Sequence, residues 1–406
     1  MPDRAWPVRR LGDLATWMSG GTPSTHNADY WGGDIPWISA ASLRDFNIDD
    51  SDRRLTVLGA AHGTRLAPAG STIFVVRGMS LKSEFRVGIA QRTVAFGQDC
   101  KALVPAEGID PRYLAWAIKA STPKILTMVD EAGHGTGRLE TRLIANHQVG
   151  VPPLAEQRRM VEILDSVDEQ SSTAKMCLSK LVRQLDGATL SLGGDARWPD
   201  VRLGDVLDGA RGSRIQTGPF GSQLHAHDYV VDGTPVVMPQ DILAGKISTT
   251  QIATVGQGKI AELSRHILCE GDVVLSRRGD LGRCSLITVR ETGWLCGTGC
   301  LLVRTGNVSL TPGWLALVYR GWHCQMQIAA RAVGSTMPNL NTSILESLVF
   351  PLPSVDDQYR ALAMINQYRD ACARSEAVIA KYVALKQALM DDLLTGRVRV
   401  PVGAEG

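Results

Sequence analysis

The sequence predicts an α+β (mixed α/β) protein made of two repeated α/β domains and two long helices that pack antiparallel as a coiled coil. Three observations predict this fold: a long helical segment at residues 151–192, a segment of the same pattern 201 residues later, and matching strand and turn motifs ahead of each. Two matched antiparallel helices in one chain would relate its halves by a pseudo-twofold axis.

The first long helix follows two prolines and carries Glu156 in its first turn, where a negative charge suits the helix dipole. Its apolar residues keep a seven-residue spacing, which is typical of a coiled coil rather than of a globular core helix. The predicted seam residues of this helix are Leu164, Val167, Leu178, Leu181 and Leu185.

The same seam returns in the second helix, shifted by 201 residues. A register shared over nine seam positions favours a duplicated chain with paired helices over two unrelated helices. Lys386 interrupts the second seam, and we expect its side chain to snorkel towards water. The predicted seam residues of this helix are Ile365, Tyr368, Ile379, Tyr382 and Leu389.

The segments ahead of the two helices share an order of motifs. RLGD occurs at 10–13 and 202–205, and a β-branched strand between glycines occurs at 70–78 and 271–279. A capped helix start follows in each half, at Asp110-Pro111 and at Thr311-Pro312. We therefore predict a first domain at 1–154, a first helix at 155–193, a second domain at 194–354, a second helix at 355–396 and a tail at 397–406.

The amino-acid composition indicates an ordinary globular protein without a membrane span. The 406 residues are 44% apolar and 21% charged, which is ordinary for a globular protein, and no apolar run approaches the length of a membrane span. The start, MPDRAWPVRRLGD, has no apolar signal core, so we expect a cytoplasmic protein with reduced thiols. The net charge of +2 neither requires nor forbids a nucleic-acid partner.

Catalytic motifs are absent from the sequence. It contains no phosphate loop, no nucleophile elbow and no amino-methyltransferase tetrapeptide, the nearest match to which is VPPL at 151–154. Asp99-Cys100-Lys101 fits a nuclease-like D-x-K tripeptide, which chance alone explains in a chain of this length. Cys296 and Cys300 lack the paired ligands of a zinc site. We expect no catalytic residue, no metal and no cofactor in this chain.

Two copies of one scaffold with different loops suit a partner that has repeating geometry and two unlike sites, and double-stranded DNA is such a partner. Arg and Gln read base edges, whereas Lys, Ser and Thr mostly hold phosphates. Any one of these side chains is also compatible with an ordinary solvated surface. The candidate DNA-binding residues are Thr22, Ser24, Tyr30, Arg77, Lys82 and Arg86 in the first half, and Arg211, Arg214, Gln216, Ser222, Gln223, Arg277 and Arg278 in the second.

Several of these segments resemble a known family. GGTPS at 20–24, YWGGDIPWI at 30–38, PPLAEQRR at 152–159 and LLTGRV at 393–398 are similar to the specificity (S, HsdS) subunit of Type I restriction–modification enzymes. The resemblance covers nearly the full length, including the duplication. It implies that each half is a target-recognition domain with a spacer helix. Each domain would read one part of a bipartite, asymmetric DNA sequence, and the helices would set the spacing.

The same resemblance implies partners. Two methyltransferase (M) subunits would bring S-adenosylmethionine and adenine-N6 methylation, and restriction (R) subunits would bring ATP, Mg and DNA cleavage. The S subunit itself catalyses nothing. The second helix start departs from the family pattern, because Tyr359-Arg360 follows its glutamine where the first helix has two arginines.

Two other functions remain open at this point. One is a single-chain nuclease or DNA methyltransferase with a divergent site. The other is a coiled-coil scaffold that holds partner proteins without reading DNA. Methylation by the chain alone would favour the first, and a target that survives exchange of residues 1–150 would favour the second.

Overall fold

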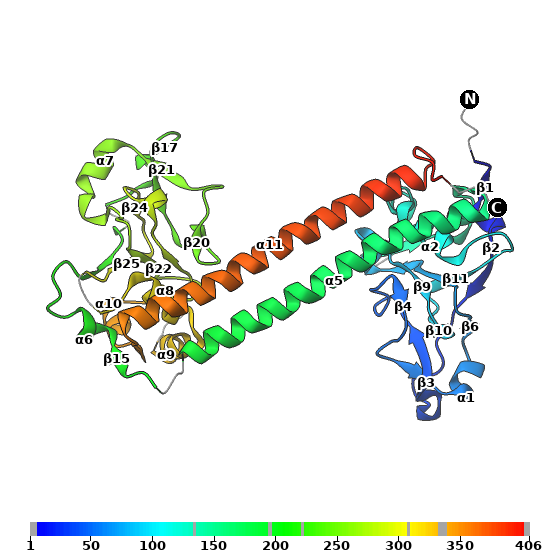
Figure 1. Ribbon diagram of the computed structural model, residues 1–406, viewed down its shortest axis with the longest axis horizontal. Coiled ribbons are helices and arrows are strands. Elements are labelled where there is room, and N and C mark those ends of the chain that lie inside the picture. Colours follow the sequence, from blue (N-terminus) through cyan, green and yellow to red (C-terminus); the bar gives the residue numbers. More distant parts are fainter. Residues whose placement is uncertain are drawn as a thin grey trace. The chain divides into compact units, whose positions relative to one another are not determined.

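The computed structural model describes residues 6–132, 135–193, 197–220, 223–306, 309–331 and 339–401. The chain divides into two compact units, Met1–Lys175 with Ala377–Gly406, and Met176–Glu376. Helix α5 (Leu154–Gly193) and helix α11 (Val355–Leu393) each give one part to either unit (Figure 1).

The first unit is built on a five-stranded sheet of order β2-β11-β7-β9-β4. A four-stranded sheet of order β5-β3-β10-β6 holds a small second core with helix α1, and three-stranded and two-stranded sheets complete the unit. The strands of the two larger sheets are β2 (Ala15–Ser19), β3 (Trp31–Ile38), β4 (Asn47–Ile48), β5 (Arg54–Leu55), β6 (Leu66–Ala67), β7 (Thr72–Val75), β9 (Val87–Ala90), β10 (Val94–Phe96) and β11 (Cys100–Pro105). The smaller sheets contain β1 (Val8–Arg10), β8 (Arg77–Gly78), β12 (Val129–Ala132), β13 (Thr136–Leu139) and β14 (Gln148–Gly150).

Helix α2 (Pro111–Ala120) covers the five-stranded sheet. Asp110 caps it by accepting hydrogen bonds from the backbone N–H groups of Arg112 and Tyr113. Trp116 of α2 is fully buried, and its ring centroid lies 4.1 Å from that of Phe46. The other short helices of the unit are η1 (Leu11–Asp13), η2 (Ala28–Tyr30), α1 (Val57–Ala61), η3 (Met79–Lys82), α3 (Thr122–Leu126) and α4 (Thr141–Ala145).

The second unit repeats this plan with sheets of order β16-β25-β22-β23 and β17-β21-β18-β24. Its strands are β15 (Asp200–Arg202), β16 (Arg214–Thr217), β17 (Tyr229–Val230), β18 (Thr234–Val237), β19 (Ile242–Leu243), β20 (Lys246–Ile247), β21 (Ala253–Val255), β22 (Val273–Ser276), β23 (Cys284–Leu286), β24 (Leu295–Cys296), β25 (Cys300–Arg304) and β26 (Val349–Pro351). Its short helices are α6 (Leu203–Leu207), η5 (Ala226–Asp228), η6 (Pro239–Asp241), α7 (Gln257–Glu262), η7 (Ser264–His266), η8 (Val289–Glu291), α8 (Pro312–Arg320), α9 (Trp322–Arg331) and α10 (Thr342–Glu346). The predicted mixed fold with two repeated domains and long helices is confirmed.

The two long helices run antiparallel within each unit. In the first unit Leu164 of α5 shares a core with Leu393 of α11. In the second unit Leu192 of α5 packs on a core that contains Ile365 of α11. Of the predicted seam residues, Leu164, Val167 and Ile365 are buried, and the half-buried ones are Leu178, Leu181, Leu185, Tyr368, Ile379, Tyr382 and Leu389.

Lys386 does not snorkel as expected. Its Nζ lies 2.7 Å from Asp168 Oδ1 on α5, and the lysine side chain is only 16% exposed. The ammonium group is therefore paired with a carboxylate instead of reaching into water, which removes the cost of a cation at a seam position.

None of the helices in the described ranges has the length and apolar character needed to cross a membrane.

Candidate nucleic-acid interface

A buried glutamine joins the first long helix to the domain before it. Gln157 has no exposed surface, and its Oε1 accepts a hydrogen bond of 2.8 Å from the backbone N–H of Asp110. Its Nε2 donates to the carbonyl oxygens of Gly108 at 3.1 Å and Pro152 at 2.8 Å. Two of these hydrogen bonds tie the start of α5 to the start of α2, and the third holds the side chain on the segment just before α5.

The second unit has the same junction 201 residues later. Gln358 is fully buried, and its Oε1 accepts a hydrogen bond of 2.8 Å from the backbone N–H of Thr311, the residue that caps α8. Its Nε2 donates to the carbonyl oxygens of Ser309 at 2.6 Å and Pro353 at 2.9 Å. Each unit therefore holds its helix at the same place on the domain.

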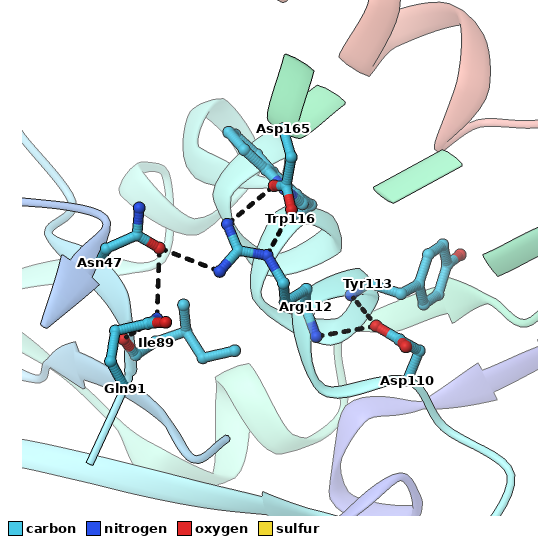
Figure 2. Close-up of polar contacts among 8 residues, drawn as sticks. All are labelled: Asn47, Ile89, Gln91, Asp110, Arg112, Tyr113, Trp116 and Asp165. Carbon is cyan, nitrogen blue, oxygen red and sulfur yellow. Dashed lines mark hydrogen bonds and ion pairs between the residues drawn. The ribbon is translucent and has the colours of Figure 1, made fainter. Parts of the chain in front are cut away.

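Arg112 makes a second link between α2 and α5 in the first unit. Its Nε and Nη2 donate to the two carboxylate oxygens of Asp165 at 2.5 and 2.8 Å, and Trp116 Nε1 donates to the same carboxylate at 2.9 Å (Figure 2). Arg112 Nη1 also donates to Asn47 Oδ1, which accepts from Gln91 as well. A bidentate charged contact of this kind fixes orientation as well as distance.

The second unit replaces this link with apolar packing. Gly313 stands where Arg112 would fall after the 201-residue shift, and a Cβ atom there would lie 2.9 Å from Leu362 Cδ1 of α11. The absence of a side chain lets the helix approach closely, so the two units position their domains by different chemistry.

The C-terminal tail contacts the start of α5 through Arg399, which binds Glu156. Glu156 is 2% exposed, and Arg399 donates to its two carboxylate oxygens at 2.7 and 2.8 Å while Trp6 Nε1 donates at 3.2 Å. The corresponding Asp357 of the second unit accepts a hydrogen bond from Ser354 Oγ at 2.7 Å near the surface.

Four loops of the first unit meet at one edge of its sheets. Gly21 N–H donates to Phe96 O at 3.0 Å, and Gly97 N–H donates to Ile38 O at 2.8 Å. Val76 N–H donates to the carbonyl of Asp99 at 2.8 Å. The loops that follow β2, β3, β7 and β10 are therefore adjacent, and they carry most of the predicted DNA-binding residues of this half.

The loop after β2 presents Thr22 and Ser24, which are both exposed. The Ser24 carbonyl accepts a hydrogen bond of 3.0 Å from Trp31 Nε1, which holds the loop on β3. Tyr30 is half-buried, with its ring stacked on that of His62 at a centroid distance of 5.6 Å.

The loop after β7 presents three predicted cations, and the structure places an unpredicted one beside them. Arg77 on β8 lies directly opposite Arg138 on β13, and both side chains are exposed. On the other side of β13, Asp130 of β12 pairs with Arg138 in the sheet. Among the described residues, no carboxylate lies within ion-pair distance of Arg77 or Arg138. Lys82 is exposed, and its Nζ is 3.4 Å from where a Cβ of Gly135 would stand.

Arg86, the remaining candidate of this half, is held by acceptors of its own domain. Its Nε donates to Glu84 at 2.8 Å and its Nη1 donates to Ala40 O at 3.1 Å. Arg283 of the second unit makes the equivalent contact, with Nη1 donating to Pro239 O at 3.1 Å. The two arginines are not related by the 201-residue shift, so the sequence repeat alone does not pair them.

The candidates on and before β16 lie in different environments. Arg211 is exposed in the turn before the strand, and Arg214 is half-buried with its Nε free of hydrogen bonds. Gln216 Nε2 lies 3.0 Å from Nδ1 of His266, a buried residue whose pKa is lowered by burial and by nearby arginines. Ser222 lies outside the residues that the structure describes.

The other candidates of the second half gather near the end of β22. Arg278 is exposed and forms an antiparallel bridge to Asn339, as Arg77 does to Arg138 in the first unit. Arg277 Nε donates to Asn339 Oδ1 at 3.1 Å, and its guanidinium lies 6.0 Å from the ring centroid of Phe220. Gln223 Oε1 accepts from Phe220 N–H at 3.2 Å, and the Phe220 side chain is 55% exposed.

The thiols are poorly suited to redox or metal chemistry. Cys296 and Cys300 are buried and form no disulfide, and burial raises the pKa of Cys296 to about 12 and that of Cys300 well above its ordinary value. Across the described ranges, no group of three or more His, Cys, Asp or Glu side chains is placed to hold a metal ion.

Comparison with known proteins decides the family. The family model described as the Type I restriction modification DNA specificity domain matches the chain twice, at residues 3–180 and 196–381. This chain belongs to that family. The first match overlaps Met1–Lys175 of the first unit, and the second overlaps most of Met176–Glu376.

Individual members of the specificity family agree with this assignment. The Type I restriction enzyme EcoR124I/EcoR124II specificity subunit of Escherichia coli is 32% identical over 162 residues, which are 39% of this chain and 40% of that protein. The Type I restriction enzyme MjaIX specificity subunit of Methanocaldococcus jannaschii is 25% identical over 419 residues, covering 97% of this chain and 94% of that protein. The crystal structure of the Type-I restriction-modification system S subunit from M. genitalium has the same fold, with a TM-score of 0.61, 14% identity and 97% of both chains covered.

Proposed function

We propose that this chain is the DNA-reading subunit of a Type I restriction–modification complex. Each unit reads one part of a bipartite, asymmetric DNA target, and α5 and α11 fix the spacing between the two parts. The chain catalyses no reaction itself.

One observation carries this proposal. The two units share the buried glutamine junction, with Gln157 and Gln358 making the same hydrogen bonds. They differ at the exposed strand ends, where Arg138 of the first unit corresponds to Asn339 of the second. Arginine pairs with guanine and asparagine with adenine in the major groove, so a common scaffold with different exposed side chains suits two different half-sites.

The proposed partners are double-stranded DNA, two methyltransferase (M) subunits and, in a restricting complex, restriction (R) subunits. S-adenosylmethionine, ATP and Mg would be bound by those subunits. The names of the relatives, which are specificity subunits of Type I restriction enzymes, support this assignment. The paired helices support a role as the platform for the methyltransferase subunits, and the whole assembly would work in the cytoplasm.

A domain exchange tests the division of labour. Residues 1–154 are replaced by those of a related subunit with a different target, and the methylated adenines of the host DNA are mapped by sequencing. We expect one half of the methylated sequence to change and the other half to stay. A target that stays entirely unchanged would identify a scaffold that does not read DNA.

Two further measurements separate the alternatives. Methylation or cleavage by the purified chain without partners would show a single-chain enzyme and end the proposal. Lengthening α5 and α11 by matched helical turns is expected to widen the gap between the half-sites without altering either half. Altered bases within a half-site would contradict spacing by the helices.

A further inference from the structure

A cation without a carboxylate partner stands at the last turn of the sheet-covering helix in both units. In the first unit it is Lys119 of α2, and after the 201-residue shift it is Arg320 of α8. Neither side chain has a hydrogen bond or an ion pair with any residue of the described ranges. Basic side chains favour helix C-termini, so this position needs further evidence before it indicates a ligand.

A cavity provides that evidence in the first unit. It has a volume of about 270 Å³, and its lining includes Lys119, Arg44 and Arg86. Glu84 is the one carboxylate in the lining, and it is already bonded to Arg86 Nε at 2.8 Å. The Lys119 ammonium lies 4.7 Å from the ring centroid of Phe46, so it is held in place by aromatic contacts. The cavity therefore has an uncompensated positive charge.

The charges on the neighbouring helices do not neutralise this cavity. Asp168 of α5 lies nearby, but it is paired with Lys386 at 2.7 Å. Lys175 adds a further positive charge in the same region. Burial, with the positive charge of Lys386, lowers the pKa of Lys119 to about 8, as expected for a lysine whose counter-ion is missing.

The second unit places a cation at the same position of its helix, and the side chain of Arg320 is exposed. The Arg320 guanidinium presses against the backbone of Gly245, where a Cβ would lie 1.8 Å from its Nη1. Arg283 Nη1 donates a hydrogen bond to Pro239 O of the neighbouring loop, as Arg86 Nη1 donates to Ala40 O in the first unit. Burial and then the positive charge of Arg320 lower the pKa of Arg369 on α11.

We propose that Lys119 in the first unit and Arg320 in the second each bind a backbone phosphate of the target DNA. The cavity of Lys119, with a volume of about 270 Å³, has room for one phosphate group. The change from lysine to arginine between the units keeps the positive charge, which is the property that a phosphate contact requires. The cavity is also lined by Ser83 and Glu84, which follow η3 directly, so it adjoins the loop that carries Arg77 and Lys82.

This inference rests on the proposed DNA-reading function. It assigns Lys119 and Arg320 as positioning residues that hold the duplex on each unit without selecting its sequence. They contribute the same affinity to every DNA duplex, whereas the exposed strand-end side chains, such as Arg138 and Asn339, contribute the preference for particular bases.

The experiment uses the full chain assembled with its methyltransferase subunits. Binding to a duplex with the methylated target and to a scrambled duplex is measured between 50 and 300 mM salt for the wild type, Lys119→Gln and Arg320→Gln. One lost phosphate contact is expected to lower the slope of log affinity against log salt by about 0.9. We expect each variant to weaken both duplexes by the same factor, about three- to tenfold near 150 mM salt, and to leave the methylated sequence unchanged.

Two control variants accompany these. Lys119→Arg is expected to keep the wild-type DNA affinity and salt slope, because it keeps the positive charge. Lys124→Gln removes an exposed lysine from α3 of the same unit, and it is expected to change the slope by much less than Lys119→Gln.

Several results would overturn the inference. If a folded Lys119→Gln complex keeps the wild-type DNA affinity and salt slope, Lys119 binds no phosphate and only stabilises the end of its helix. A changed methylated sequence would mean that the side chain reads a base. Weaker assembly with the methyltransferase subunits in the absence of DNA would point to a partner carboxylate. If the wild-type complex shows no sequence preference at all, the proposed DNA-reading function fails, while the salt slopes still decide whether these cations bind phosphate.

Discussion

Gln157 Oε1 accepts a 2.8 Å hydrogen bond from the backbone N–H of Asp110, so the first long helix is bonded directly to the residue that caps α2. All three hydrogen bonds of Gln157 involve backbone groups, and the side chain has no exposed surface. Truncation would leave the N–H of Asp110 and the carbonyl of Pro152 without these partners in a largely buried site, which costs more than the hydrogen bonds themselves contribute.

Gln157→Ala is therefore expected to lower the free energy of unfolding by about 1–3 kcal/mol. Denaturant unfolding followed by tryptophan fluorescence measures this. Gln184→Ala, an exposed glutamine of the same helix, is the matched control and should stay within about 0.5 kcal/mol of the wild type. Equal effects of the two substitutions would show that the junction adds nothing to stability.

The ion pair between Lys386 and Asp168 predicts that a double variant is more stable than the single variant. Lys386→Leu removes the partner of a half-buried carboxylate, and we expect it to destabilise the protein by about 1 kcal/mol. Adding Asp168→Leu removes the unpaired charge as well, and the double variant is expected to be near the wild type. Additive losses in the double variant would contradict a coupled pair.

Two buried histidines predict how stability depends on pH. Burial and then Lys124 lower the pKa of His147, and burial and then Arg265 lower that of His266, both from 6.5. The unfolded chain consequently binds protons that the folded chain does not, so the free energy of unfolding falls as the pH drops below about 6.5 and levels off below the folded pKa values. Thermal midpoints at pH 5.0–7.5 measure this, and His147→Gln with His266→Gln should flatten the curve. An equally steep curve in that variant would assign the effect to other groups.

The pKa of Lys119 can be measured directly. NMR of reductively methylated lysines is expected to show one lysine titrating at about 8. Lys386→Met removes a positive neighbour and frees the carboxylate of Asp168, so both effects should raise the pKa of Lys119. A titration that does not move in this variant would mean that burial alone sets the pKa.

The exposed strand end of the second unit predicts an effect on one half-site only. Arg278→Ala is expected to relax the base preference at one position of one half of the target, with a loss of about 1–3 kcal/mol of discrimination. Sequencing of methylated adenines with the variant complex tests this, and Arg290→Ala, on the surface of the same unit, is the control. Loss of preference in both halves would argue against independent reading by the units.

The repeat and its helices could be predicted because their signals are periodic. Seven-residue spacing marks Leu164 and Ile365, and the 201-residue shift pairs Gln157 with Gln358. Propensity and capping also indicated α2, since Asp110 and Pro111 form a characteristic helix start. These features depend on local residues and do not require knowledge of the sheets.

The arrangement of the exposed strand ends could not be predicted in the same way. Arg138 comes to lie opposite Arg77 through pairing of strands that are far apart in sequence, and no local pattern specifies that pairing. The seam position of Lys386 does not reveal its environment, because that depends on Asp168 of the other helix. Lys119 has no distinctive sequence signal, because a lysine near a helix end is common and the cavity beside it is formed by distant residues.

The hairpin between β7 and β9, and its counterpart between β22 and β23, have a further consequence. They span residues 75–86 in the first unit and 276–283 in the second, yet both hairpins close with the same backbone hydrogen bond, Val75 N–H to Arg86 O and Ser276 N–H to Arg283 O. The arginine at the end of each then reaches a carbonyl of the neighbouring loop. The sheet thus clamps both ends of the hairpin and leaves its length free. If the proposed function holds, insertions and deletions in the hairpin can change the DNA target while the strand pairing that closes it is kept, so target preference and stability can evolve separately.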